Sequence, residues 1–328
     1  MNEIVKTNRK LWIDLLRGIA IILVIFGHQG SVLKDFFVWT SPIKMPLFFA
    51  ISGFLFTNKG SLYIGKLFMR LIFPYCILSL VPVVIVCHYF TGSNIYNEVL
   101  QFLFGWFIPT FFFSSILFRV LVVKLSNNKW LLFASFLIAA VGVIIPQNEI
   151  LRVFEFKTIL IAQHFMALGY AWKDLKKDDD SKPINRIVLI ISIATYVILG
   201  SVNLIYYPLE SIDVHTSSYY NPILCYIMIL TGLYIMYVIG KYIGEKYENT
   251  IIVKTGALIG KHAIVIFLTQ TIATIFLSFT LGSILPPNNR SYVTSLIYTI
   301  CMVMISTIIG VICEKYCPIV LGISKKKK

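Results

Sequence analysis

The sequence predicts an all-α, polytopic integral membrane protein with about ten transmembrane helices and both termini in the cytoplasm. Three observations lead to this fold class. Hydrophobic residues make up 58% of the chain and charged residues only 13%, well below the charged fraction of soluble domains. The apolar residues gather into runs of membrane length, and the lysines and arginines are distributed unevenly between the segments that connect these runs.

Ten apolar runs are candidates for transmembrane helices, because a helix needs about 20 apolar residues to cross the hydrocarbon core. The first run contains Asp14 and Arg17 and lacks a small-residue cleavage site, so we expect a retained span rather than a signal peptide. The second and fifth runs are short. In chain order the runs are Leu11–Gly30, Met45–Phe56, Leu71–Phe90, Phe102–Val123, Trp130–Ile145, Thr158–Trp172, Ile187–Tyr206, Pro222–Gly240, Ala263–Leu281 and Ser291–Val311.

The placement of positive charge accounts for the net charge of +14 without a nucleic-acid partner. With the amino terminus inside, 22 of the 29 lysines and arginines fall in cytoplasmic segments and five in outer segments, while Arg17 and Arg119 lie within spans. Membrane proteins carry such an excess of Lys and Arg on the cytoplasmic side. The alternation therefore predicts an even number of spans and two cytoplasmic termini.

The segments between the runs are too short to form a separate soluble domain. The stretch from Lys241 to His262 has about twenty residues, whereas an independent domain usually needs at least about 40. We therefore expect residues 1–328 to form a single membrane domain. The six cysteines lie in or beside apolar runs without paired metal spacing, so we predict no disulfide and no metal site.

Three ionisable residues of the first run, Asp14, Arg17 and His28, share one helix face. Arg17 and His28 are separated by three turns, about 16 Å along a helix, and Asp14 precedes Arg17 by about one turn. Ionisable residues at membrane depth usually face a bundle interior or a watery cavity, which makes this face a candidate site. The alternative is that Asp14 and Arg17 extend to the inner headgroups and His28 to the outer ones.

Two further motifs combine small or basic residues with an apolar run. Ser52 and Gly53 interrupt bulky residues, which permits the close approach either of a ligand or simply of another helix. Lys66 and Arg70 lie one helical turn apart on the cytoplasmic side of a span. They form either a phosphate clamp or an interfacial anchor.

Aromatic residues and the remaining histidines are weaker candidates. Trp106 begins an aromatic cluster at the outer end of the fourth run, where an interfacial belt is expected. His164 should lie at membrane depth and is the histidine to test after His28. The others, His88, His215 and His262, lie near span ends or in a loop and are more often structural.

The motifs of the first three spans together resemble the acyltransferase family 3 of membrane O-acyltransferases. The similarity rests on Arg17 and His28 in the first span, Phe48-Phe49-x-x-Ser52-Gly53-Phe54-Leu55, and the basic motif before Pro74-Tyr75. Later segments resemble the fucose 4-O-acetylase-like branch, so the resemblance covers most of the chain. These segments are Trp106-Phe107-Ile108-Pro109, Leu168-Gly169-Tyr170 and residues 213–222.

The chain departs from the family pattern at two places. The family often has two arginines before the third span, where this chain has Lys66 and Arg70, and Lys cannot make the bidentate contact of Arg. In the ninth span Gln270 occupies a position that is often His in the family. Gln cannot act as an acid or a base, so any role of Gln270 is hydrogen bonding.

The resemblance implies a single acyltransferase domain that moves an acetyl group from acetyl-CoA to a sugar hydroxyl of a surface polysaccharide or its lipid-linked precursor. Arg17, Lys66 and Arg70 are then expected to hold the anionic end of CoA, and Asp14 to pair with Arg17. His28 would act either as a general base or as an acyl acceptor. Ser52, Gly53 and Trp106 would support the site, and no permanently bound cofactor is expected.

The acceptor would enter from the outer face, where Trp106, Phe107, Tyr219 and Tyr220 are available to stack on sugar rings. The expected partners are acyl-CoA, a carbohydrate acceptor and the lipid bilayer, with no nucleic acid, and the expected location is a bacterial cytoplasmic membrane. The rival interpretation is a non-catalytic polysaccharide exporter or flippase, because some members of this superfamily are described as exporters.

Overall fold

The computed structural model describes residues 10–29, 34–58, 63–80, 107–146, 155–177, 185–207, 221–281 and 291–323, and every regular element in these ranges is a helix. The all-α class is therefore confirmed for this part of the chain. The elements are α1 (Leu11–Gly27), α2 (Lys34–Leu55), α3 (Ile64–Tyr75), the π-helical turn η2 (Cys76–Leu80), α6 (Phe107–Lys124), α7 (Asn128–Ile144), α9 (Phe156–Lys177), α10 (Arg186–Tyr206), α11 (Pro222–Lys246), α12 (Ile251–Lys261), α13 (Ala263–Leu281), α14 (Tyr292–Tyr316) and the 3₁₀ turn η3 (Pro318–Leu321).

Several helices begin where the sequence provides a capping side chain. Asn127, Asn185 and Asn221 accept hydrogen bonds from the first free backbone N–H groups of α7, α10 and α11, and Thr250 and Ser291 do the same for α12 and α14. Such caps satisfy donors that a helix end leaves without partners. The starts of these five helices are thus fixed locally.

Six helices in the described ranges are long and apolar enough to cross a membrane. They are α2, α6, α10, α11, α13 and α14, so the predicted multi-pass character is supported. The total of about ten spans and the cytoplasmic location of both termini stay predictions. Much of the surface of these helices is apolar, as Ile187, Ile198 and Ile223 show with exposed fractions of 60% or more, which suits a surface in contact with lipid.

Helices α2, α3 and α12 differ most from the sequence-based expectation. Helix α2 begins at Lys34 rather than near Met45, because the helix continues through Pro42 and Pro46. Helix α3 begins at Ile64, after Tyr63 with its positive φ of 43°, rather than at Leu71. Helix α12 was not expected, since its 11 residues are too few to form a span.

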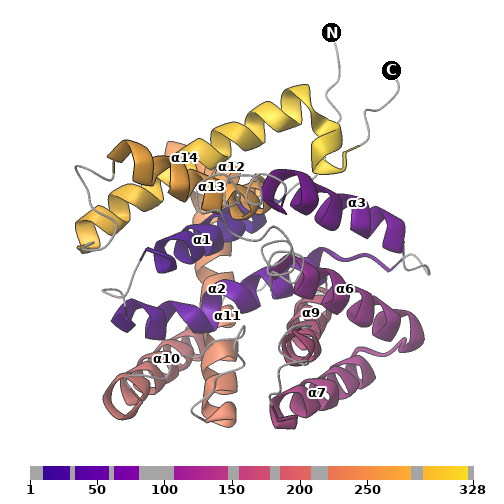
Figure 1. Cartoon of the computed structure of the whole chain (residues 1–328). Helices are drawn as coiled ribbons and strands as arrows, with labels where there is room; N and C mark the ends of the chain where they lie inside the picture. The colour runs from indigo at the N-terminus through magenta and orange to yellow at the C-terminus, as the bar shows by residue number, and fades with distance from the viewer. Residues whose placement is uncertain are drawn as a thin grey trace.

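Helices α1 and α2 occupy the centre of the bundle (Figure 1). Helix α1 contacts α2, α11, α12, α13 and α14, and α2 also contacts α9, α10 and α11. Helices α7, α9 and α10 lie on one side of this central pair and α12, α13 and α14 on the other, α11 runs along the pair from one side to the other, and α3 lies beside α6. The first predicted span is therefore an interior helix, on which the Asp14 side chain is buried, the Arg17 side chain is 30% exposed and His28 is exposed at the C-terminal end.

Candidate active site

Asp14 and Arg17 form an ion pair within α1. The Arg17 Nη1 atom lies 3.6 Å from the Asp14 Oδ1 atom, and the Asp14 side chain is 7% exposed against 30% for Arg17. A buried carboxylate is costly unless it is paired, and the pairing with Arg17 offsets that cost. This is the partner that the sequence spacing predicts for Asp14.

Helix α12 packs against the same segment of α1 through glycines. A Cβ atom added to Gly260 would collide with the backbone oxygen of Asp14, and one added to Gly18 would collide with the backbone oxygen of Gly256. Small residues spaced four apart allow two helix backbones to approach closely. Because Gly260 is followed by Lys261, this approach places a second cation near Arg17.

A small cavity of about 90 Å³ lies beside Arg17, and we call it the Arg17 pocket. Its lining residues come from α1, α2, α3, α6, α12 and α13. The polar side chains are those of Arg17, Ser52 and Lys261, and the remaining lining residues are Ile21, Phe48, Leu71, Phe107, Ile108, Phe111, Gly260, Ala263, Ile264 and Phe267. A mostly apolar cavity with two cations suits a small anionic group or an oxyanion.

Lys261 was not among the residues that the sequence motifs indicated. Its Nζ atom lies 2.6 Å from the Glu314 Oε2 atom of α14, and the Nε2 atom of the buried His262 lies 3.4 Å from the same oxygen. Glu314 therefore holds the junction between α12 and α13. The Gly256-x-x-x-Gly260 spacing is the sequence signal that indicates this close helix contact.

Ser52 and Gly53 have different roles, although they are neighbours on α2. Ser52 lines the Arg17 pocket. Gly53 faces α9, where a Cβ atom would collide with the backbone oxygen of Met166. The helix-packing interpretation therefore holds for Gly53, and the pocket interpretation remains for Ser52.

Lys66 and Arg70 lie on one exposed face of α3 and are not part of the pocket lining. The Lys66 Nζ atom lies 4.7 Å from the centre of the Tyr63 ring. Leu67 and Leu71, which alternate with the two cations, are buried instead. Both side chains lie outside the Arg17 pocket, and their role as a phosphate clamp stays a prediction.

His28 lies directly after the last residue of α1 and is exposed within the described part of the chain. Its backbone N–H continues the helix hydrogen bonding to Val24 and Ile25. Since α1 is unbroken from Leu11 to Gly27, the predicted rise of about 16 Å from Arg17 to His28 applies. Arg17 thus lies near the middle of this interior helix, and His28 follows its C-terminal end.

Some predicted site residues lie outside the described ranges, namely Trp106, His88, His215, Tyr219 and Tyr220. Phe107, which we expected to meet sugar on the outer face, is buried. Its ring centre lies 4.5 Å from that of Phe267 and 5.9 Å from that of Phe48. That prediction was wrong, because the ring of Phe107 is part of the apolar wall of the Arg17 pocket.

His164 is buried at a three-helix contact away from the Arg17 pocket. Its Nδ1 atom lies 2.8 Å from the Ser135 Oγ atom of α7, and its Nε2 atom lies 2.7 Å from the Tyr226 hydroxyl of α11. Both ring nitrogens are therefore used in joining α7, α9 and α11. This geometry supports the structural interpretation of His164.

A family model described as an acyltransferase domain, that of acyltransferase family 3, matches residues 10–315. The chain belongs to this family. No curated protein and no solved structure matches it. As a member of this family it is a multi-pass membrane protein with an acyltransferase domain, and the domain includes all the residues that form the Arg17 pocket.

In an acyltransferase of this kind, the Arg17 pocket offers two cations and one hydroxyl in an apolar setting. These groups suit an anionic acyl donor better than a metal ion. No group of three His, Cys, Asp or Glu side chains in the described ranges is arranged to hold a metal. The pocket of about 90 Å³ is smaller than a typical cofactor site, so it accommodates only a narrow part of such a donor.

Proposed function

We propose that this acyltransferase transfers an acetyl group from acetyl-CoA to a sugar hydroxyl of a surface polysaccharide or its lipid-linked precursor, in a bacterial cytoplasmic membrane. Family membership supports the acyl transfer. The resemblance of Trp106-Phe107-Ile108-Pro109 and Leu168-Gly169-Tyr170 to the fucose 4-O-acetylase-like branch supports an acetyl donor and a sugar acceptor. The observation that carries the proposal is that interior helix α1 has a cationic pocket at Arg17, near its middle, and His28 at its C-terminal end.

The donor site is assigned to the part of α1 around Arg17. Arg17 and Lys261 bind phosphate oxygens of CoA at the pocket, since charge-assisted contacts to phosphate are among the strongest hydrogen bonds. Lys66 and Arg70, exposed on α3, bind the rest of the nucleotide outside the pocket. The pantetheine arm then extends along α1, over the distance of about 16 Å that separates Arg17 from His28.

His28 carries the chemical step at the C-terminal end of α1. As a general base, its imidazole takes the proton of the sugar hydroxyl while the oxygen attacks the thioester carbonyl, the C–S bond breaks and the CoA thiolate leaves. As an acyl acceptor, the imidazole first takes the acetyl group from CoA and then passes it to the hydroxyl. Both routes yield an acetyl ester and CoA thiol.

The test compares surface glycans from cells with and without the gene, and from cells that express His28→Ala, by mass spectrometry. The proposed enzyme predicts that acetylated glycan disappears in the deletion and in His28→Ala, while polymer still reaches the surface. A deletion that leaves glycan acetylation unchanged contradicts the proposal. Loss of surface polymer itself would favour the exporter.

A further inference from the structure

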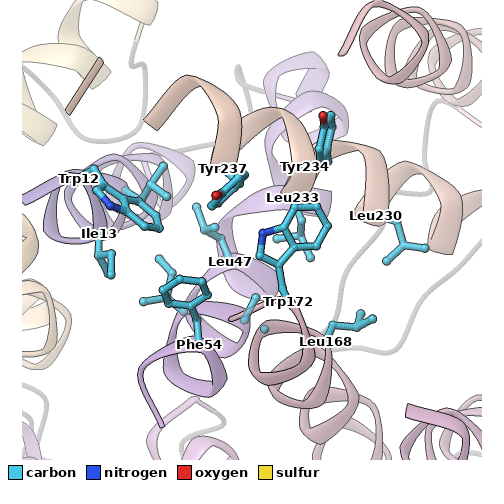
Figure 2. A pocket seen from close by; sticks show the side chains of 14 residues that line it. Trp12, Ile13, Leu47, Phe54, Leu168, Trp172, Leu230, Leu233, Tyr234 and Tyr237 are labelled. Atoms are coloured by element: carbon cyan, nitrogen blue, oxygen red, sulfur yellow. The ribbon is translucent and has the colours of Figure 1, made fainter. Parts of the chain in front are cut away.

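A second cavity, of about 280 Å³, lies on another face of the central pair α1 and α2. Its walls come from α1, α2, α9 and α11 (Figure 2). Trp12 of α1, Phe54 of α2 and Trp172 of α9 gather around Tyr237 of α11, with ring centres between 5.2 and 5.6 Å apart for the three contacting pairs. The lining is almost entirely apolar, so we call it the apolar cavity.

The apolar cavity lies where α9 and α11 are joined only by side chains. At one end the His164 Nε2 atom lies 2.7 Å from the Tyr226 hydroxyl. At the other end the Trp172 ring packs edge-on against Tyr234 and Tyr237. Leu168 and Leu230 line the cavity between these two bridges.

The two helices that pack on α9 and α11 have apolar outer faces. Helix α7 packs on α9 and α10 packs on α11, and α7, α9 and α10 lie on the same side of the central pair (Figure 1). Phe133 and Leu137 of α7 and Ile190 and Ile198 of α10 are exposed. Exposed apolar side chains face lipid in a multi-pass protein. Lipid acyl chains are therefore expected next to the helices that form the cavity.

One polar atom in the wall of the apolar cavity has no partner. The Nε1 atom of Trp172 is buried and has no hydrogen-bond acceptor within the described ranges. A buried N–H without an acceptor is costly. The next residue, Lys173, donates from Nζ to the Phe56 backbone oxygen, which places Trp172 beside the charged end of α9. An occupant is therefore expected to be apolar and to carry one oxygen acceptor near that end.

We propose that the apolar cavity binds a fatty acyl chain of a phospholipid, with the ester carbonyl oxygen accepting the hydrogen bond of Trp172 Nε1. A glycerolipid carries its ester oxygens at the boundary between headgroups and hydrocarbon, where Trp side chains also gather. An isoprenoid lipid carries its oxygens only at the terminal phosphate. A sugar or nucleotide would leave most of its polar groups without partners in this lining. The proposal does not depend on the transfer reaction.

Native mass spectrometry of the full chain, delipidated in detergent and titrated with palmitoyl-oleoyl-phosphatidylglycerol, tests this site. Leu233→Trp and Leu230→Phe each fill the cavity and should bind one lipid fewer per chain than the wild type. Ile198→Trp adds an indole to the exposed face of α10 and should bind as many as the wild type. Trp172→Phe keeps an aromatic side chain, although a smaller one, and removes the N–H; it should weaken the lipid-binding step that the filling variants lose about fivefold.

Equal lipid binding by the wild type and both filling variants overturns the proposal. A Trp172→Phe variant with unchanged affinity overturns the assigned hydrogen bond. A parallel titration with a polyprenyl phosphate tests whether the cavity binds an isoprenoid chain instead. If the polyprenyl phosphate binds at the site that Leu233→Trp removes and displaces the phosphatidylglycerol, the assignment to a fatty acyl chain is wrong.

Discussion

Lys261 and Glu314 form an ion pair with 2.6 Å between Nζ and Oε2, and this pair holds a cation of α12 at the Arg17 pocket. Both side chains are more than a third exposed, so the pair contributes little to stability. Its effect is on position. Arg17 and Lys261 each have a carboxylate partner, Asp14 or Glu314. At the proposed donor site, an anionic donor would therefore compete with these carboxylates.

Replacing Lys261 by Gln is expected to raise the KM for acetyl-CoA about tenfold, because one charge-assisted contact to phosphate is lost. The control is Lys254→Gln, an exposed lysine on the same helix that does not line the pocket. Steady-state release of CoA thiol from purified protein measures both. The same KM in the two variants would remove Lys261 from the donor site.

Arg17→Ala is expected to lower donor affinity and thermal stability together, because Asp14 stays buried without its charged partner. Arg17→Lys should recover stability more than activity, since Lys keeps the charge but lacks the planar fork. Thermal unfolding in detergent and donor titration separate the two effects.

The double variant Asp14→Asn, Arg17→Ala tests whether the unpaired Asp14 carboxylate causes the loss of stability in Arg17→Ala. Asn has no charge to bury, so stability should recover relative to Arg17→Ala while donor affinity stays low. Full donor affinity in a stable Arg17→Ala protein would show that Arg17 acts only on the fold.

Residue patterns within one helix predicted the features that depend on interactions within that helix. Ala263–Leu281 was predicted as a span and is α13 to the residue, because its apolar run ends where the helix does. The pairing of Asp14 with Arg17 followed from a spacing of one helical turn. Periodicity within one helix is sufficient for both.

The parts that the sequence did not reveal depend on contacts between distant segments. Lys261 was counted as one more cytoplasmic cation, and only the packing of α12 on α1 brings it to the Arg17 pocket. Phe107 followed a Trp and was assigned to the outer face, whereas packing against Phe267 buries it. The spacing of Gly256 and Gly260 indicates a close helix contact but not which helix is the partner, and the contact of Phe107 with Phe267 has no signal within its own helix.

Because α1 and α12 are in close contact, adding one methyl group at Gly260 should lower the stability of the protein. Gly260→Ala places a Cβ atom against the Asp14 backbone oxygen and should destabilise the protein by about 1–3 kcal/mol. Gly65→Ala on α3 is the control, because a Cβ atom there meets nothing within 4 Å, and Ala in a helix is favoured by about 0.5–1 kcal/mol. Thermal unfolding should move in opposite directions for the two variants, and a harmless Gly260→Ala would contradict the packing.

His164→Phe tests the structural role of the second membrane-depth histidine. Loss of the imidazole leaves the Ser135 and Tyr226 hydroxyls without that partner, which should cost about 1–3 kcal/mol of stability. Acetyl transfer per folded molecule should stay near the wild-type level. A stable but inactive His164→Phe protein would instead place His164 in the reaction.

His28 is expected to behave in the opposite way. His28→Ala should lower acetyl transfer by about 10²–10⁴-fold while the protein reaches the membrane at normal abundance, because this residue is exposed and follows the end of α1. His28→Gln keeps the size and hydrogen bonding of the side chain but neither its basicity nor its nucleophilicity, so it should be equally inactive. Product from the Gln variant would exclude His28 as both base and acyl acceptor and leave it a structural role. An acetylated imidazole trapped in a rapid quench with radiolabelled acetyl-CoA would select the acyl-acceptor route, since a general base never carries the acetyl group.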